Sequence, residues 1–68
     1  MTLTHKRLIM RLKQHRAKQG LSQADLGEKA GITREYIARL ETGRHDPSLG
    51  TLVKLAKALK VKVGKLVE

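Results

Sequence analysis

The chain has 68 residues, of which 40% are apolar and 1% aromatic, so it has room for one small domain with an aliphatic core. Fifteen Lys and Arg against six Asp and Glu give a net charge of +9, which indicates a polyanionic partner. The absence of cysteine excludes a disulfide scaffold, a cysteine-ligated zinc site and a thiol nucleophile.

The first expected helix runs to about Lys18. Its apolar residues Leu8, Ile9 and Leu12 follow the spacing i, i+1, i+4, which places them on one helical face. Gly20 can end this helix, because glycine adopts the left-handed conformation without a steric clash of a Cβ atom.

Two short helices are expected next, each with its own start and stop signal. Ser22 can cap the first of them by accepting from the amide of Asp25, whose carboxylate can return to the amide of Ser22. Gly31 ends that helix, Thr33 caps the next one, and residues 42–43 close it. Four residues of this third helix are expected to point outward together: Arg34, Glu35, Ala38 and Arg39.

Ser48 starts a fourth helix, whose apolar residues recur at i, i+3, i+4 and i+7: Leu52, Leu55, Ala56 and Leu59. In residues 61–68, the alternation of Val61 and Val63 fits a short strand, but a last helical turn after a bend suits an all-α chain better. We therefore predict an all-α, compact bundle of four to five helices, with residues 1–68 forming a single domain.

The segment from Gln23 to Thr42 carries the functional signal. Its two helices are joined by the three-residue turn at 31–33, and the small residues Gly27 and Ala30 stand where the helices would cross closely. This pattern predicts a helix-turn-helix at about residues 22–42, whose second helix can enter the major groove of DNA. That groove, about 12 Å wide, admits one helix and exposes the base edges.

Several runs of this sequence resemble the Cro/repressor (XRE-like) family of helix-turn-helix proteins, over about residues 8 to 66. The matching runs are Arg16 through Leu21-Ser22-Gln23-Ala24-Asp25-Leu26, Ala30-Gly31-Ile32-Thr33, Ile37 to Gly43, Pro47-Ser48-Leu49 and Leu55-Ala56-Lys57-Ala58-Leu59. The resemblance implies a lambda-repressor-like DNA-binding domain in which the helix after the turn reads bases.

The resemblance also implies roles for individual residues. The base-reading residues would be Thr33, Arg34, Glu35 and Arg39. The residues on the DNA backbone would be Ser22, Gln23, Tyr36, Arg44 and Ser48. Arg16 and Glu41 would form a structural ion pair. The charge pattern adds Lys13, on the first helix, as a contact to a flanking phosphate.

Each of these roles has a plainer alternative. Arg34 can donate two hydrogen bonds to a guanine, or it can be an exposed charge that reaches phosphate, and Arg39 has the same choice. Glu35 can accept from a cytosine or simply be a favourable acid at a helix N-terminus. Tyr36 can lie beside the DNA backbone or a thymine methyl, or pack partly on the bundle.

Four positions depart from the family pattern. Gly27 replaces a usual alanine and lowers helix propensity by roughly 1 kcal/mol, and His15 stands where an apolar residue is common. Lys60 replaces the glycine that normally follows the fourth helix, so we expect a different bend there, and Gly64 weakens a fifth helix. The last two changes affect the carboxy-terminal region that the family uses to dimerise.

We expect no enzyme, cofactor or metal site. His5, His15 and His45 are scattered without metal-ligand spacing, and no glycine-rich phosphate loop, nucleophile elbow or pair of catalytic carboxylates is present. No apolar run reaches the roughly 20 residues that span a bilayer, and no signal peptide pattern is present. We therefore expect a cytoplasmic, nucleoid-associated protein of a prokaryote or phage.

The sequence thus predicts a sequence-specific transcriptional regulator, in the first place a repressor, that binds a palindromic operator in double-stranded DNA as a homodimer. One alternative keeps the same chemistry: an antitoxin or restriction-modification controller that regulates its own operon, with a toxin or other protein as partner. A different alternative is an adaptor that uses the third helix to bind other proteins.

Overall fold

The computed structural model describes the backbone of residues 3–67 and the side chains of residues 6–67; the side chain of His5 and the residue Glu68 lie outside these ranges. The elements, in chain order, are α1 (Leu3–Lys18), α2 (Gln23–Ala30), α3 (Arg34–Glu41), α4 (Leu49–Leu59) and α5 (Gly64–Val67). The predicted all-α class is confirmed, and the segment with alternating valines ends in a helical turn. None of the helices in residues 3–67 has the length and apolarity that crossing a membrane requires.

The predicted caps form at the starts of three helices. The Ser22 hydroxyl accepts from the amide of Asp25 at 2.9 Å, and the Asp25 carboxylate accepts from the amide of Ser22 at 2.9 Å. The hydrogen bond from the Ser22 amide to the Asp25 carboxylate lowers the pKa of Asp25, because it favours the charged form. Thr33 caps α3 at the amide of Tyr36, and Ser48 caps α4. Local side-chain chemistry therefore sets where each helix begins.

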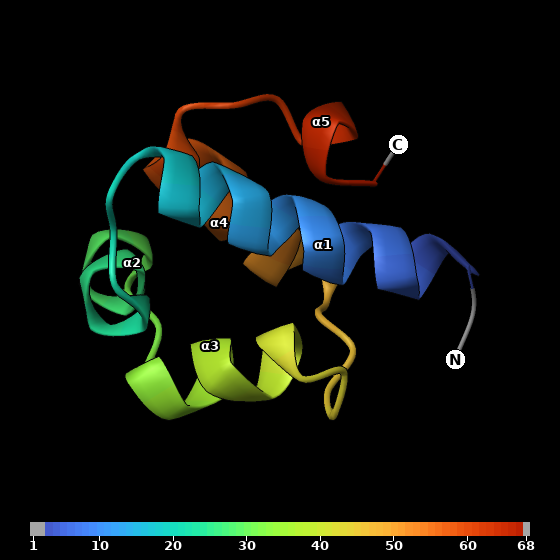
Figure 1. The fold of residues 1–68 in the computed structure, drawn as a ribbon, viewed down its shortest axis with the longest axis horizontal. Helices are drawn as coiled ribbons and strands as arrows, with labels where there is room; N and C mark the ends of the chain where they lie inside the picture. The colour runs from blue at the N-terminus through green and yellow to red at the C-terminus, as the bar shows by residue number, and fades with distance from the viewer. Residues whose placement is uncertain (1–2, 68) are drawn as a thin grey trace.

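The core lies between the long helix α1 and the four shorter helices. Its largest fully buried side chains come from all five helices: Leu12, Leu26, Ile37, Leu55, Leu59 and Leu66. In Figure 1, α3 and α5 lie on opposite sides of α1, and α4 passes behind it. The helix α5 packs on α1 through the buried Leu66, and α3 lies at the opposite edge of the molecule (Figure 1).

Gly27 is explained by how closely α2 approaches the turn that precedes α3. The amide of Ile32 donates to the carbonyl of Gly27 at 2.8 Å. A Cβ atom on Gly27 would lie 2.5 Å from the backbone oxygen of Ile32 and 3.3 Å from the backbone nitrogen of Arg34. The turn therefore lies closer to α2 than an alanine at this position would allow, and the weaker helix propensity of glycine is offset by this close packing.

Lys60 ends α4 in the left-handed conformation, with φ 59° and ψ 39°. It is the only residue other than glycine with positive φ in the described part of the chain. The replacement of glycine therefore leaves a left-handed turn in place, contrary to the expectation of an altered bend, and Gly64 begins α5. The side-chain amide of Gln19 donates to the carbonyl of Leu59 at 2.6 Å and fixes this end of α4 to α1.

We expect Lys60→Gly to stabilise the protein by about 1 kcal/mol, because a side chain costs about 1–2 kcal/mol in the left-handed region and glycine does not. Thermal unfolding followed by circular dichroism should show a midpoint about 4–8 °C higher. Lys57→Gly is the matched control: Lys57 lies within α4, so glycine there should lower stability by about 1 kcal/mol. A midpoint that falls in both variants would contradict the strain assigned to Lys60.

Candidate nucleic-acid interface

The helix α3 presents polar side chains to solvent along one face and apolar ones to the core along the other. Ile37 and Leu40 are buried. The four predicted base-reading residues are all exposed: Thr33, Arg34, Glu35 and Arg39. Since α3 lies at the edge of the molecule (Figure 1), nothing in the described chain covers this face. The arrangement leaves two guanidinium groups on a rigid helix where a ligand can approach.

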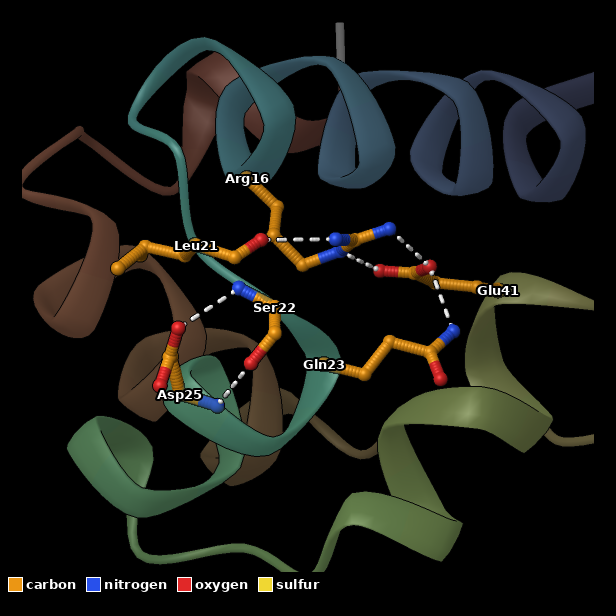
Figure 2. A network of polar contacts seen from close by, with 6 residues as sticks. All are labelled: Arg16, Leu21, Ser22, Gln23, Asp25 and Glu41. Carbon is orange, nitrogen blue, oxygen red and sulfur yellow. Dashed lines mark hydrogen bonds and ion pairs between the residues drawn. The ribbon is translucent and has the colours of Figure 1, made fainter.

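An ion pair fixes α3 to α1. Arg16 donates to both carboxylate oxygens of Glu41, from Nε at 2.7 Å and from Nη2 at 2.9 Å. Its Nη1 donates to the carbonyl of Leu21 at 2.8 Å, so the same guanidinium also holds the chain between α1 and α2 (Figure 2). Glu41 is only 3% exposed. The structure thus places Arg16 and Glu41 in the predicted pair.

The hydrogen bond to Glu41 raises the pKa of Arg16, and the Coulomb attraction between the two groups adds to this effect, while partial burial opposes it. When folding raises the pKa of a basic group, that group stabilises the folded protein fully at pH values below its pKa in the unfolded chain. This stabilisation is lost only as the pH rises through the higher pKa of the folded state. The Arg16 guanidinium therefore stays charged throughout the neutral range.

Gln23 extends the ion pair to α2. Its side-chain Nε2 donates to Glu41 Oε1 at 3.0 Å, and the side chain is half-buried. Figure 2 shows the amide oxygen of Gln23 turned away from Glu41. The contact of Gln23 with the DNA backbone stays a prediction. One hydrogen of its side-chain amide already donates to Glu41 inside the protein. No local pattern could have indicated this contact, because the two residues are 18 positions apart.

The other predicted backbone contacts surround α3. Ser22 and Ser48 are exposed and already serve as helix caps, so their hydroxyl oxygens accept within the protein. The hydroxyl hydrogen of Ser22 is what that residue could offer a phosphate, whereas the Ser48 hydroxyl also shares a hydrogen bond with the Thr51 hydroxyl at 3.0 Å. Arg44 is exposed just beyond the end of α3, and its amide donates to the carbonyl of Arg39 at 3.0 Å. Lys13 is exposed on α1 and lines an open groove between α1 and the end of α3.

Tyr36 is half-buried and packs against the core, which agrees with the alternative that this side chain packs partly on the bundle. Its ring contacts that of His45 edge-on, with the ring centres 4.7 Å apart and the planes at 71°. This contact ties the loop after α3 to the helix itself. Sequence reasoning did not predict it, because neither residue carries a pairing signal.

Comparison with known proteins decides the family. The model of the helix-turn-helix family matches residues 12–66, which cover all five helices at least in part. The chain belongs to the Cro/repressor-like helix-turn-helix family. This helix-turn-helix regulator is 43% identical over 53 residues to an uncharacterised HTH-type transcriptional regulator of Methanocaldococcus jannaschii, covering 78% of this chain and 80% of the relative.

Two further similarities show how the domain is used elsewhere. The regulator is 42% identical over 57 residues to the immunity repressor of Bacillus phage phi105, covering 84% of this chain but 40% of that repressor. The crystal structure of the restriction-modification controller protein C.AhdI from Aeromonas hydrophila superimposes with a TM-score of 0.86 at 35% identity, covering 88% of this chain and 91% of the controller. The predicted family and its role in transcription regulation are thus confirmed.

Proposed function

We propose that the protein binds double-stranded DNA sequence-specifically and represses transcription by covering a promoter, with α3 in the major groove. The observation that carries the proposal is the exposed face of α3, where Thr33, Arg34, Glu35 and Arg39 stand clear of the core. The Arg16–Glu41 pair supports it, because it fixes the helix on which these side chains are mounted. A fixed helix that exposes two guanidinium groups, those of Arg34 and Arg39, is suited to base edges and phosphates together.

Arg34 is the residue to which we assign the strongest base contact. It is the first residue of α3, and in this binding mode the N-terminal residues of the recognition helix contact base edges. Its guanidinium can donate two hydrogen bonds to guanine O6 and N7. Glu35 stands next to it and can accept from cytosine N4, while Arg39, more than a turn later, reaches a base or a phosphate.

A homodimer suits the size of the molecule. Its longest dimension is 27 Å, which is less than the roughly 34 Å between successive major grooves on one side of DNA. One copy therefore reaches one groove and reads only a few base pairs. Two copies related by a twofold axis would read a palindromic operator and gain the discrimination that a single short helix lacks.

We expect Arg34→Ala to relax base preference at one position of the site and to cost about 1–3 kcal/mol there. Selection of bound sequences from a random duplex library, carried out with the wild type and the variant, measures this directly. Lys13→Ala is the control, because loss of a phosphate contact should weaken all sequences alike. A uniform loss with Arg34→Ala would reassign this residue to the backbone, and no enrichment by the wild type would refute the proposal.

The likeness to C.AhdI supports a second candidate within the same chemistry, a controller that regulates its own operon. The selected site distinguishes the two candidates. Its presence upstream of the protein's own gene, with binding that represses that gene, would favour the controller.

A further inference from the structure

The loop between α3 and α4 is fixed at its first residues by the way in which α3 ends. Gly43 takes the left-handed conformation with φ 77°, and its amide donates to the carbonyl of Leu40 at 3.2 Å. The amide of Arg44 donates to the carbonyl of Arg39 at 3.0 Å. This pair of hydrogen bonds around a left-handed glycine is a Schellman motif, so the backbone of Arg44 belongs to the end of α3.

The middle of the loop is attached to α3 through two rings. The ring of His45 lies edge-on to that of Tyr36, with 4.7 Å between the ring centres and 71° between the planes, a geometry that aromatic rings prefer. Tyr36 stands about one turn before Leu40 in α3, so the loop folds back along the helix to make this contact. Figure 1 shows the loop curling beside the end of α3 before it runs to α4. Because Tyr36 packs against the core, it holds the exposed His45 in place.

The far end of the loop is fixed by contacts of its own. The Ser48 hydroxyl accepts from the amide of Thr51 at 3.1 Å, and Pro47 lines a small apolar pocket together with Leu40 and other side chains of the core. Removal of the ring of His45 should therefore loosen the middle of the loop without releasing its two ends.

Arg44 stands between the Schellman motif and the ring contact. Its amide is bonded to α3 on one side, and the next residue, His45, is held against Tyr36 on the other. Its side chain is exposed, and among residues 6–67 its guanidinium has no hydrogen bond or ion pair. A cation on a backbone that is already ordered has less freedom to lose when it binds an anion, and therefore binds more tightly.

We propose that His45 is a positioning residue, which holds the Arg44 guanidinium beside α3, where it binds a phosphate of the DNA that α3 enters. The inference deepens the proposed function and rests on it. His45 acts through the order of the loop and does not itself touch the DNA. Since phosphate contacts fix the orientation of a protein on the duplex, the ring contact also helps to set how α3 lies in the groove.

The first test is the affinity of the protein for the selected duplex, measured by fluorescence anisotropy. We expect His45→Ala to weaken binding about three- to tenfold, the change in an equilibrium constant that corresponds to an aromatic pair of this kind. His45→Phe keeps a ring that can lie edge-on to Tyr36, so it should bind within about twofold of the wild type. His15→Ala is the matched control, because His15 lies on α1 and is not part of the loop, and its affinity should not change. Equal weakening by His45→Ala and His45→Phe would mean that the imidazole itself contacts DNA, and would overturn the proposal.

A double-mutant cycle tests whether His45 acts through Arg44. Arg44→Ala removes the guanidinium, so the further change His45→Ala should weaken binding by less than about twofold in that background. If the losses caused by the two changes multiply in full, His45 does not position Arg44 and the proposal is wrong.

Hydrogen exchange of the Arg44 amide, followed by nuclear magnetic resonance, tests the ring contact without DNA. We expect this amide to exchange about three- to tenfold faster in His45→Ala than in the wild type or in His45→Phe, because the loop opens more often. The Thr42 amide is the internal control: it donates to the carbonyl of Ala38 at 3.1 Å at the end of α3, and its exchange should not change. An Arg44 amide that exchanges equally in all three proteins would show that the rings do not order the loop, and would overturn the proposal.

The failure of this inference is distinguishable from failure of the proposed function. If the proposed function fails, the wild type enriches no duplex, and the assignment of Arg44 to a phosphate fails with it even where the ring contact orders the loop. If the inference alone fails, the wild type still enriches a DNA sequence, and His45→Ala binds that sequence as tightly as the wild type does.

Discussion

Replacing Arg16 by alanine is expected to lower the free energy of unfolding by about 3–5 kcal/mol, because it leaves a buried carboxylate without its cation. Glu41 is 3% exposed, and in the variant only the Gln23 amide would still donate to it. The carbonyl of Leu21 would lose its donor as well. A domain of this size has a total stability of only several kcal/mol, so we expect the variant to be close to unfolded at room temperature.

Urea denaturation followed by circular dichroism measures this loss. Arg34→Ala is the control, since removal of an exposed arginine should change stability by no more than about 0.5 kcal/mol. The double variant Arg16→Met, Glu41→Leu should be more stable than Arg16→Ala, because apolar residues of similar size need no partner. A loss below about 1 kcal/mol for Arg16→Ala would mean that water reaches Glu41 and that the pair is not what positions α3.

Raising the salt concentration from 50 to 200 mM is expected to weaken binding to the selected duplex by about 10³- to 10⁵-fold. Each phosphate neutralised by a lysine or arginine releases a condensed counterion, and this release is less favourable in concentrated salt. The exposed cations Arg34, Arg39 and Arg44 surround α3, and Lys13 stands beside it on α1. The proposed homodimer would double this number of contacts.

Fluorescence anisotropy titrations at several salt concentrations give the slope of log K against log salt. Lys13→Ala should reduce that slope by about 1. Lys65→Ala on α5, which lies on the opposite side of α1 from α3 (Figure 1), should leave it unchanged. A slope near zero would show that the ligand is not a polyanion, and would favour the adaptor that binds other proteins through α3.

The bounds of the helices could be predicted because the signals are local. The Ser22–Asp25 box, the Thr33 and Ser48 caps and the left-handed glycines at 20 and 31 all act within about four residues of the chain. Apolar spacing then indicates which face of each helix turns inward. The exposed residues Arg34, Glu35 and Arg39 of α3 were predictable for the same reason, since Ile37 and Leu40 define the opposite face.

The contacts that the sequence did not reveal join residues distant along the chain. Gln23 meets Glu41 because α2 and α3 cross, and Gln19 meets the end of α4 at Leu59 because α1 lies beside it. The close approach at Gly27 depends on the path of the turn in space. A helix-propensity scale contains only the loss of helix stability that glycine causes, and not the close packing that it permits.

The sequence by itself determined the helices, their inner and outer faces, the helix-turn-helix and the cationic character of the molecule, because each depends on neighbours a few residues away or on composition. The tertiary structure decided which polar groups are used inside the protein, that Lys60 takes a left-handed turn, and that Leu49 and Val53 are exposed. These depend on how the helices cross, and the crossing is set by the packing of all five helices around one core.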